Sequence, residues 1–217
     1  MTILLSILRS IYWNFRIFPF AVARHLPLLI HYRYRVKVAR GSIQITNPQL
    51  KFAMLKIGLF GAEEIPIQGI GSLIIKNGGE LVVTGPMFIG AGSSVIIDHG
   101  HLTIGASFWM NRNGLLSISH ASRIGAENIF GWQVALIDGN GHHIQYRDQQ
   151  FPKKGIQLGQ HNWLAAQVSV LSGAELGDHN VVSYGSLVTS KPYVHRSHQL
   201  YGGVPAHPIR TIVTWHD

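Results

Sequence analysis

The chain has 217 residues, of which 46% are hydrophobic and 13% are charged, so it is long enough for one substantial domain and short for two. It contains 24 glycines and 9 prolines, which favour many turns and few long helices. Cysteine is absent, which excludes a disulfide framework and a zinc site built on thiolates and fits a reducing compartment.

The net charge of +8 is concentrated at the N-terminus. Residues 1–40 contain seven Lys or Arg and no acid, whereas residues 41–217 carry eleven bases against ten acids. Arg9, Arg16 and Arg24 interrupt the apolar residues too often for a membrane span, and no signal peptide is evident. The segment is compatible with a helical cap whose arginines face water, and with a basic, aromatic surface resting on an anionic membrane leaflet. Nucleic-acid binding is disfavoured because no recognition motif accompanies the charge.

Further along the chain, aliphatic residues recur at every sixth position. The upstream part shows three runs separated by slips, each of which predicts a bulge or short insertion: Val83, Ile89 and Val95; Ile104, Met110 and Leu116; and Ile118, Ile124, Phe130 and Leu136. A helix would give a spacing near 3.6 and a strand a spacing of 2. A period of six instead indicates a triangular coil, in which each unit is a short strand plus a corner and stacked turns pair as parallel strands.

The repeat breaks between residues 137 and 157, where Asp, Gly, His and Gln replace the aliphatic residues. This composition predicts a loop ejected from the coil, and loops held on rigid scaffolds often carry function. The period then returns in a single phase, with aliphatic residues at six successive positions: Leu158, Leu164, Val170, Leu176, Val182 and Val188.

The stretch from Leu158-Gly-Gln-His-Asn-Trp-Leu-Ala-Ala to Gly185-Ser-Leu-Val-Thr resembles the hexapeptide-repeat acyltransferases. Gly202-Gly-Val-Pro-Ala is similar to an element that those enzymes carry after the coil. The opening Tyr12-Trp-Asn-Phe-Arg and Phe18-Pro-Phe resembles members found with capsule and lipopolysaccharide synthesis. The resemblance is strong over about residues 85–210.

This resemblance implies an all-β fold, a left-handed parallel β-helix with a helical, apolar N-terminal segment and a short C-terminal tail. The general handedness rule for parallel crossovers would predict the opposite hand. The corresponding domain layout is a basic apolar segment over 1–40, a catalytic β-helix over 41–192 with the ejected loop 137–157, and a C-terminal extension over 193–217.

The same resemblance implies an O-acetyltransferase that moves an acetyl group from acetyl-CoA to a sugar hydroxyl in surface polysaccharide biosynthesis, without a metal. It also implies a homotrimer with its three sites at subunit boundaries. The expected location is the cytoplasm, with peripheral contact to the inner face of the cell membrane.

The catalytic residue implied by the resemblance lies in the ejected loop. Asp138-Gly-Asn-Gly-His-His-Ile is similar to the family's Asp-x-Asp-x-His pattern, and aligning Ile144 places the general base at His142. Histidine suits this role because its pKa lies near neutrality. Asp138 keeps the first acid of the pattern and is an acceptor-side candidate, whereas Asn140 replaces the second acid.

Two asparagines complete the expected acceptor site. Phe108-Trp-Met-Asn-Arg-Asn resembles the Asn-Phe-Asn of galactoside and maltose acetyltransferases, which implies that Asn111 and Asn113 bind the acceptor. The residues alone are equally compatible with two asparagines at coil corners.

The acetyl-CoA site is also implied by the resemblance. Its expected residues occupy the positions of the family's tryptophan, the residues lining pantetheine, the Thr-Lys pair and a late arginine: Trp163, Ala166, Tyr184, Thr189, Lys191 and Arg210. Ser190 separates Thr189 from Lys191, which departs from the family pattern. Cations are expected there because CoA carries several phosphate charges.

Other functions remain open from the sequence. A metal-dependent hydratase similar to γ-class carbonic anhydrases would use three histidines, and His143, His161 and His179 lie 18 residues apart. A non-catalytic scaffold with a spent site is a further alternative. Among acyltransferases, an amino sugar nitrogen or a xenobiotic remains possible as the acceptor.

Overall fold

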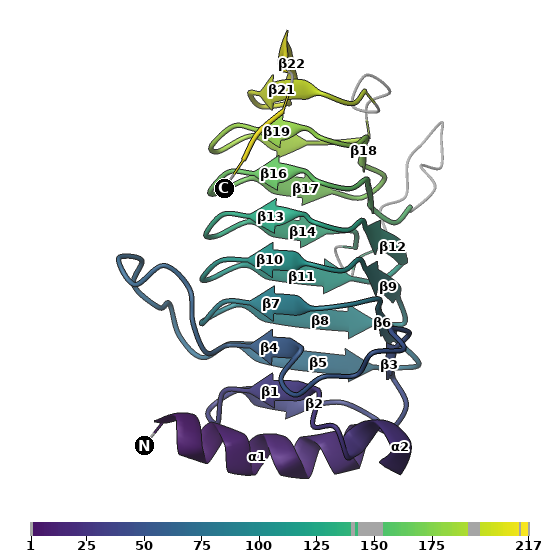
Figure 1. Ribbon diagram of the computed structural model, residues 1–217. Helices are drawn as coiled ribbons and strands as arrows, with labels where there is room; N and C mark the ends of the chain where they lie inside the picture. The colour runs from purple at the N-terminus through teal and green to yellow at the C-terminus, as the bar shows by residue number, and fades with distance from the viewer. Residues whose placement is uncertain (1, 140–141, 143–153, 191–195, 213, 217) are drawn as a thin grey trace.

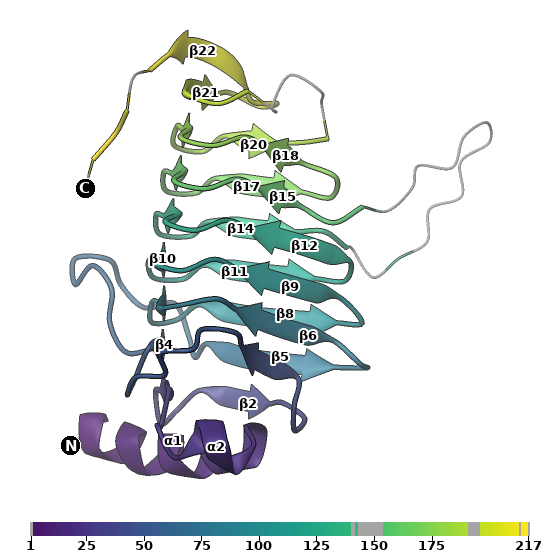
Figure 2. The ribbon, with the colours of Figure 1, turned by 45° about the vertical axis from the view of Figure 1, so that its right-hand side comes forward.

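The computed structural model describes residues 2–139, 142, 154–190, 196–212 and 214–216 as a triangular prism of stacked coils, closed at one end by helix α1 (Thr2–Ile17) and the short helix α2 (Phe20–Ala23) (Figure 1). From β1 to β20, successive strands belong in turn to three sheets, A, B and C, and strands of the same sheet pair in parallel from one turn to the next. The coil is left-handed (Figure 2). The predicted left-handed parallel β-helix is confirmed.

The three sheets contain the following strands in spatial order. Sheet A is formed by β1 (Leu28–Ile30), β4 (Leu55–Ile57), β7 (Met87–Ile89), β10 (Phe108–Met110), β13 (Ile129–Phe130), β16 (Trp163–Leu164), β19 (Val181–Val182), β21 (Gln199–Gly202) and β22 (His207–Thr211). Sheet B is formed by β2 (Arg35–Lys37), β5 (Ser72–Lys76), β8 (Ser94–Asp98), β11 (Leu115–Ile118), β14 (Ala135–Ile137), β17 (Ser169–Leu171) and β20 (Leu187–Val188). Sheet C is formed by β3 (Ile43–Ile45), β6 (Glu80–Val83), β9 (His101–Ile104), β12 (Ala121–Ile124), β15 (Gln157–Leu158) and β18 (Glu175–Leu176).

The aliphatic residues of the six-residue repeat fill the interior of the prism. All six members of the run from Leu158 to Val188 are buried, as are the upstream runs. The slips between the upstream runs have two sources. Leu116 and Ile118 both point inward from β11, so that a single strand ends one run and begins the next. The earlier slip combines such a strand, β8 with Val95 and Ile97 inward, with one extra residue at the corner that follows, which is the predicted short insertion.

The corners that lead from sheet C back to sheet A hold a ladder of buried asparagines. The side-chain oxygen of Asn128 accepts the backbone N–H of Asn162, and the oxygen of Asn162 accepts the N–H of Asn180. Each asparagine thus satisfies a buried donor of the next turn, which is a requirement for any backbone group withdrawn from water.

The coil begins earlier than the expected boundary at residue 41. Strands β1 and β2 lie within residues 1–40 and start the three-sided stack. The repeat is hard to detect there because β2 alternates exposed Arg35 and Lys37 around a single apolar residue. At the other end, β21 and β22 extend sheet A within the expected C-terminal extension, and β22 pairs antiparallel with β21.

Helix α1 covers the open end of sheet A with its polar face. Ser6, Ser10 and Asn14 are buried, and they lie four residues apart on one side of the helix. Asn14 exchanges two hydrogen bonds with the backbone of Leu28, at 2.7 and 3.0 Å. Four helical residues rise about 6 Å and two strand residues about 6.6 Å, so the helix can serve alternate residues of β1.

The remaining edge groups are bonded in the same way. Ser10 Oγ accepts the N–H of Ile30 at 2.9 Å, and Ser6 Oγ accepts the N–H of Tyr32 at 3.1 Å. The guanidinium of Arg9 donates to two further carbonyls of the first coil. The expected cap is therefore present, but Arg9 bonds the backbone rather than facing water. No helix among the described residues is long and apolar enough to cross a membrane.

Candidate active site

The predicted site residues divide between two edges of the prism. Corner AB is defined as the set of turns that lead from sheet A to sheet B, and corner BC as those that lead from sheet B to sheet C. Asn111, Asn113, Ala166 and Tyr184 follow strands of sheet A and lie at corner AB. Asp138, His142 and Thr189 follow strands of sheet B at corner BC. A single chain therefore does not bring the expected base and the expected acceptor asparagines to one edge.

Asp138 is buried at corner BC, with 1% of its surface exposed. Its carboxylate accepts hydrogen bonds from the backbone N–H groups of Ser119 and His120 and from the hydroxyl of Ser122. These three donors hold the carboxylate in one orientation. Asp138 was expected to contact the acceptor, but in this chain it faces its own corner. Acceptor binding by Asp138 stays a prediction.

Ser122 connects the two ends of the expected loop 137–157. Its hydroxyl donates to Asp138 at 2.7 Å and accepts the backbone N–H of Ile156 at 2.8 Å. Gly155 lies so close to sheet C that a Cβ atom there would meet the carbonyl oxygen of Ala121 at 1.8 Å. The two ends of the loop are consequently fixed to the prism, while residues 143–153 lie outside the described part.

His142, the expected general base, is exposed and lies four residues beyond Asp138. A second histidine that the sequence reasoning missed, His120, lies at the same corner. Its Nδ1 is 3.5 Å from a carboxylate oxygen of Asp138, and its side chain is 25% exposed. The only sequence signal for His120 was its place after Ile118, where a corner of the repeat falls. This imidazole therefore lies beside the buried carboxylate at the base of the loop.

The amides of Asn111 and Asn113 hold a second long loop, residues 58–71, against corner AB. Asn111 Oδ1 accepts the N–H of Ala62 at 3.0 Å. Asn113 accepts the N–H of Gln68 at 2.8 Å and donates to the carbonyl of Pro66 at 2.7 Å. These partners are distant in sequence, so the six-residue repeat could not reveal them. Acceptor binding by the two asparagines stays a prediction.

Three of the expected CoA residues lie on the two turns that contain β16 and β19. Trp163 projects from the outer face of β16 and is 41% exposed, and Trp215 lies beside it with ring centroids 6.2 Å apart. Ala166 is buried at corner AB, where its carbonyl accepts the N–H of Gly185, next to Tyr184. The exposed Tyr184 donates from its hydroxyl to Gln167 at 2.6 Å.

The other expected CoA residues lie on different parts of the prism. Thr189 follows β20 at corner BC, on the same edge as Asp138. Arg210 is exposed on β22, at the C-terminal end of sheet A. Lys191 lies outside the described residues. The structure therefore places Ala166 and Tyr184 together at corner AB, Trp163 and Arg210 in one cross-strand column of sheet A, and Thr189 at corner BC.

The histidines of the metal alternative lie at the corner between sheets C and A. The rings of His161 and His179 have centroids 4.9 Å apart, and His179 stacks on His198 at 4.8 Å. His143 lies outside the described residues. Within the described ranges, no group of three His, Asp or Glu side chains is arranged to hold a metal ion.

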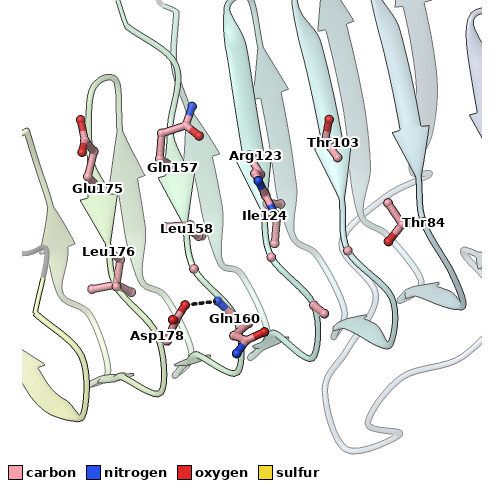
Figure 3. A pocket seen from close by; sticks show the side chains of 15 residues that line it. Thr84, Thr103, Arg123, Ile124, Gln157, Leu158, Gln160, Glu175, Leu176 and Asp178 are labelled. Atoms are coloured by element: carbon pink, nitrogen blue, oxygen red, sulfur yellow. Dashed lines mark hydrogen bonds between the residues drawn. The ribbon is translucent and has the colours of Figure 1, made fainter. Parts of the chain in front are cut away.

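The outer face of sheet C carries a groove of about 600 Å³ (Figure 3). Its polar side chains form a row across neighbouring strands, with Thr103, Arg123, Gln157 and Glu175 in register. Its floor is formed by glycines, because a Cβ atom at Gly125 would meet the carbonyl oxygen of Gly159 at 2.4 Å. None of the expected site residues lines this groove.

No protein-family model matches the chain. Several solved structures are similar to it. The polySia-specific acetyltransferase NeuO has a TM-score of 0.46 and 18% identity, over 88% of this chain and 89% of that protein. The polysialic acid O-acetyltransferase OatWY has a TM-score of 0.39 and 14% identity, over 88% and 90%. A variant of AntD, an N-acyltransferase from Bacillus cereus, in complex with dTDP and coenzyme A, has a TM-score of 0.39 and 13% identity, over 86% and 81%.

Proposed function

We propose that the protein is an acetyl-CoA-dependent O-acetyltransferase that acetylates a sugar hydroxyl during surface polysaccharide biosynthesis in the cytoplasm. The observation that carries the proposal is the position of the Asp138–His142 motif. Its histidine emerges from a left-handed β-helix at the one corner where a buried carboxylate and Ser122 fix both ends of an inserted loop. The sequence resemblance to hexapeptide-repeat acyltransferases supplies the reaction.

In the proposed reaction, His142 removes the proton from the sugar hydroxyl while the hydroxyl oxygen attacks the thioester carbonyl of acetyl-CoA. The tetrahedral intermediate collapses with cleavage of the carbon–sulfur bond, and the proton passes from the imidazolium to the departing thiolate. The products are the sugar acetate and free CoA. A backbone N–H at a corner is the proposed donor to the oxyanion. No acyl-enzyme forms, so one histidine serves as base and then as acid.

We further propose that the active enzyme is a homotrimer with one site at each subunit boundary. The separation of corner AB from corner BC supports this, because only a neighbouring chain can bring Asn111 or Tyr184 toward His142. An apolar outer face on sheet A also favours association: Phe88 and Trp109 stack at 3.8 Å, Trp109 pairs with Ile129, and Ile129 pairs with Trp163. Exposed apolar faces of this kind commonly mark interfaces.

The proposed donor site uses Trp163, Ala166 and Tyr184, with Thr189, Lys191 and Arg210 near the nucleotide. The proposed acceptor site uses Asn111 and Asn113, and Asp138 contributes by holding the base of the loop. Incubating the protein with acetyl-CoA and candidate glycans, followed by mass spectrometry, tests the function directly. We expect one added acetyl group per acceptor site together with release of free CoA. Absence of both products across neutral, acidic and amino-sugar glycans would refute the proposal.

A further inference from the structure

The N-terminal helix has the opposite orientation from an ordinary amphipathic helix on a protein. Its polar side buries Ser6, Ser10 and Asn14 against the edge of sheet A, and its apolar side faces outward. The outward residues of the two helices are large and mostly more than half exposed: Ile3, Leu4, Leu5, Leu8, Ile11, Tyr12, Phe15 and Phe20. This surface, the end face, lies across the N-terminal end of the prism (Figure 1).

The end face is surrounded by positive charge. Arg16 and Arg24 are exposed beside it, and the first coil adds further exposed bases: Arg33, Arg35, Lys37 and Arg40. Residues 2–40 contain no acid, so nothing in this part of the chain offsets the charge. Phe15 and Phe20 lie together with ring centroids 6.1 Å apart, which gives the apolar surface an aromatic centre.

We propose that the end face binds the surface of a bilayer that contains anionic lipids. An apolar, aromatic helix face ringed by arginines fits the boundary between acyl chains and anionic headgroups. Each exposed base near such a surface adds attraction, and each inserted leucine or phenylalanine adds apolar burial. Binding holds the prism upright, with α1 parallel to the membrane.

A second copy of the chain fits this face less well. In a symmetric end-to-end contact, the same basic ring of both copies would meet across the interface. Like charges brought together in this way oppose association, whereas the apolar residues alone would favour it. The charge of the face therefore favours an anionic surface as its occupant.

With α1 on the membrane, the height of His142 above the bilayer limits which acceptor it can reach, an inference that rests on the proposed function. The turn that carries Asp138 and His142 follows β14, which lies four steps along sheet B from β2. At about 4.8 Å per turn plus the diameter of α1, His142 stands roughly 30 Å above the bilayer. The acceptor sugar would then belong to a glycan that projects from a lipid anchor rather than to a lipid headgroup.

The proposal is tested by sedimenting the full chain with lipid vesicles. We expect binding to vesicles of phosphatidylcholine with about one third phosphatidylserine, with sharp weakening at high salt and no binding to phosphatidylcholine alone. Leu4→Gln with Leu8→Gln should weaken binding at least tenfold, and Arg16→Gln with Arg24→Gln should do the same at low salt. Glutamine keeps a helix propensity close to that of leucine, so folding should persist, which circular dichroism checks.

Matched controls lie elsewhere on the surface. Ile67→Gln with Ile70→Gln removes two exposed apolar residues from the 58–71 loop, and Lys154→Gln with Arg196→Gln removes two distant exposed charges. Both should bind vesicles as the native chain does, and so should His142→Ala, which separates this proposal from the catalytic one. Failure of the native chain to bind anionic vesicles would overturn the proposal. Equal binding by the Leu4/Leu8 variant, or end-to-end self-association that this variant abolishes, would overturn it as well.

Discussion

The hydroxyl of Ser122 donates a 2.7 Å hydrogen bond to the buried carboxylate of Asp138. The same oxygen accepts the N–H of Ile156, so one small side chain joins the residues that precede and follow the loop bearing His142. A catalytic loop is useful only if its ends are held in place, because small displacements of a reacting group slow catalysis strongly.

Replacing Ser122 should therefore affect both stability and turnover. Ser122→Ala removes one of the three donors to the Asp138 carboxylate and leaves the buried N–H of Ile156 without its acceptor, which should lower the free energy of unfolding by about 1–3 kcal/mol. The kcat for acetyl transfer should fall while the KM for acetyl-CoA changes little. Denaturant melts and steady-state kinetics measure both effects. Ser94→Ala, which removes one half-buried hydroxyl contact on sheet B, is the control. It should change neither the free energy of unfolding nor the kcat appreciably.

Because the polar face of α1 is buried, an apolar replacement of Asn14 should lower the stability of the protein. Asn14→Leu makes the helix more apolar, yet it should destabilise the protein by about 2–4 kcal/mol because the N–H and carbonyl of Leu28 lose their partners in a buried edge. Tyr12→Leu, on the outward side of the same helix, should cost little. Thermal unfolding measures both effects, and a lower melting temperature for Tyr12→Leu than for Asn14→Leu would contradict this role of Asn14.

Replacing Gly125 or Gly185 with alanine should lower stability for different reasons, close packing at Gly125 and backbone strain at Gly185. Gly125→Ala places a Cβ atom against the backbone of the next turn and should cost about 3 kcal/mol, near the upper end of typical overpacking penalties. Gly185 has a φ of 67° and no atom within 4 Å of an added Cβ, so Gly185→Ala should cost only about 1 kcal/mol of backbone strain. Chemical denaturation of both variants measures the difference, and equal costs would count against tight stacking at this corner.

A site shared between chains can be tested by mixing inactive variants. His142→Ala removes the base at corner BC, and Tyr184→Asp places a negative charge at corner AB, where CoA phosphates would be repelled. Co-expressed in equal amounts, the two chains should recover about a quarter of native activity, because random assembly of a ring pairs an intact base with an intact neighbour at that frequency. Activity no higher than the sum of the two variants alone would place the whole site in one chain.

The repeat was readable from the sequence because its cause is local: each six-residue unit must direct one aliphatic residue inward, from Leu158 to Val188. The polar face of α1 was not, because Ser6, Ser10 and Asn14 are buried only by virtue of their partners in β1. The contacts of Asn111 and Asn113 with the 58–71 loop were hidden for the same reason. His120 gains interest only once Asp138 is known to lie beside it, one turn later in the coil.

The most direct measurement of the central claim compares His142→Gln with the native chain in acetyl transfer and in acetyl-CoA binding. We expect a fall in kcat of about a thousandfold, within the range for loss of a general base, and a dissociation constant for acetyl-CoA within about twofold of the native value. His101→Gln, on sheet C, is the control and should behave as the native chain. Native turnover by His142→Gln would contradict the assignment of the base.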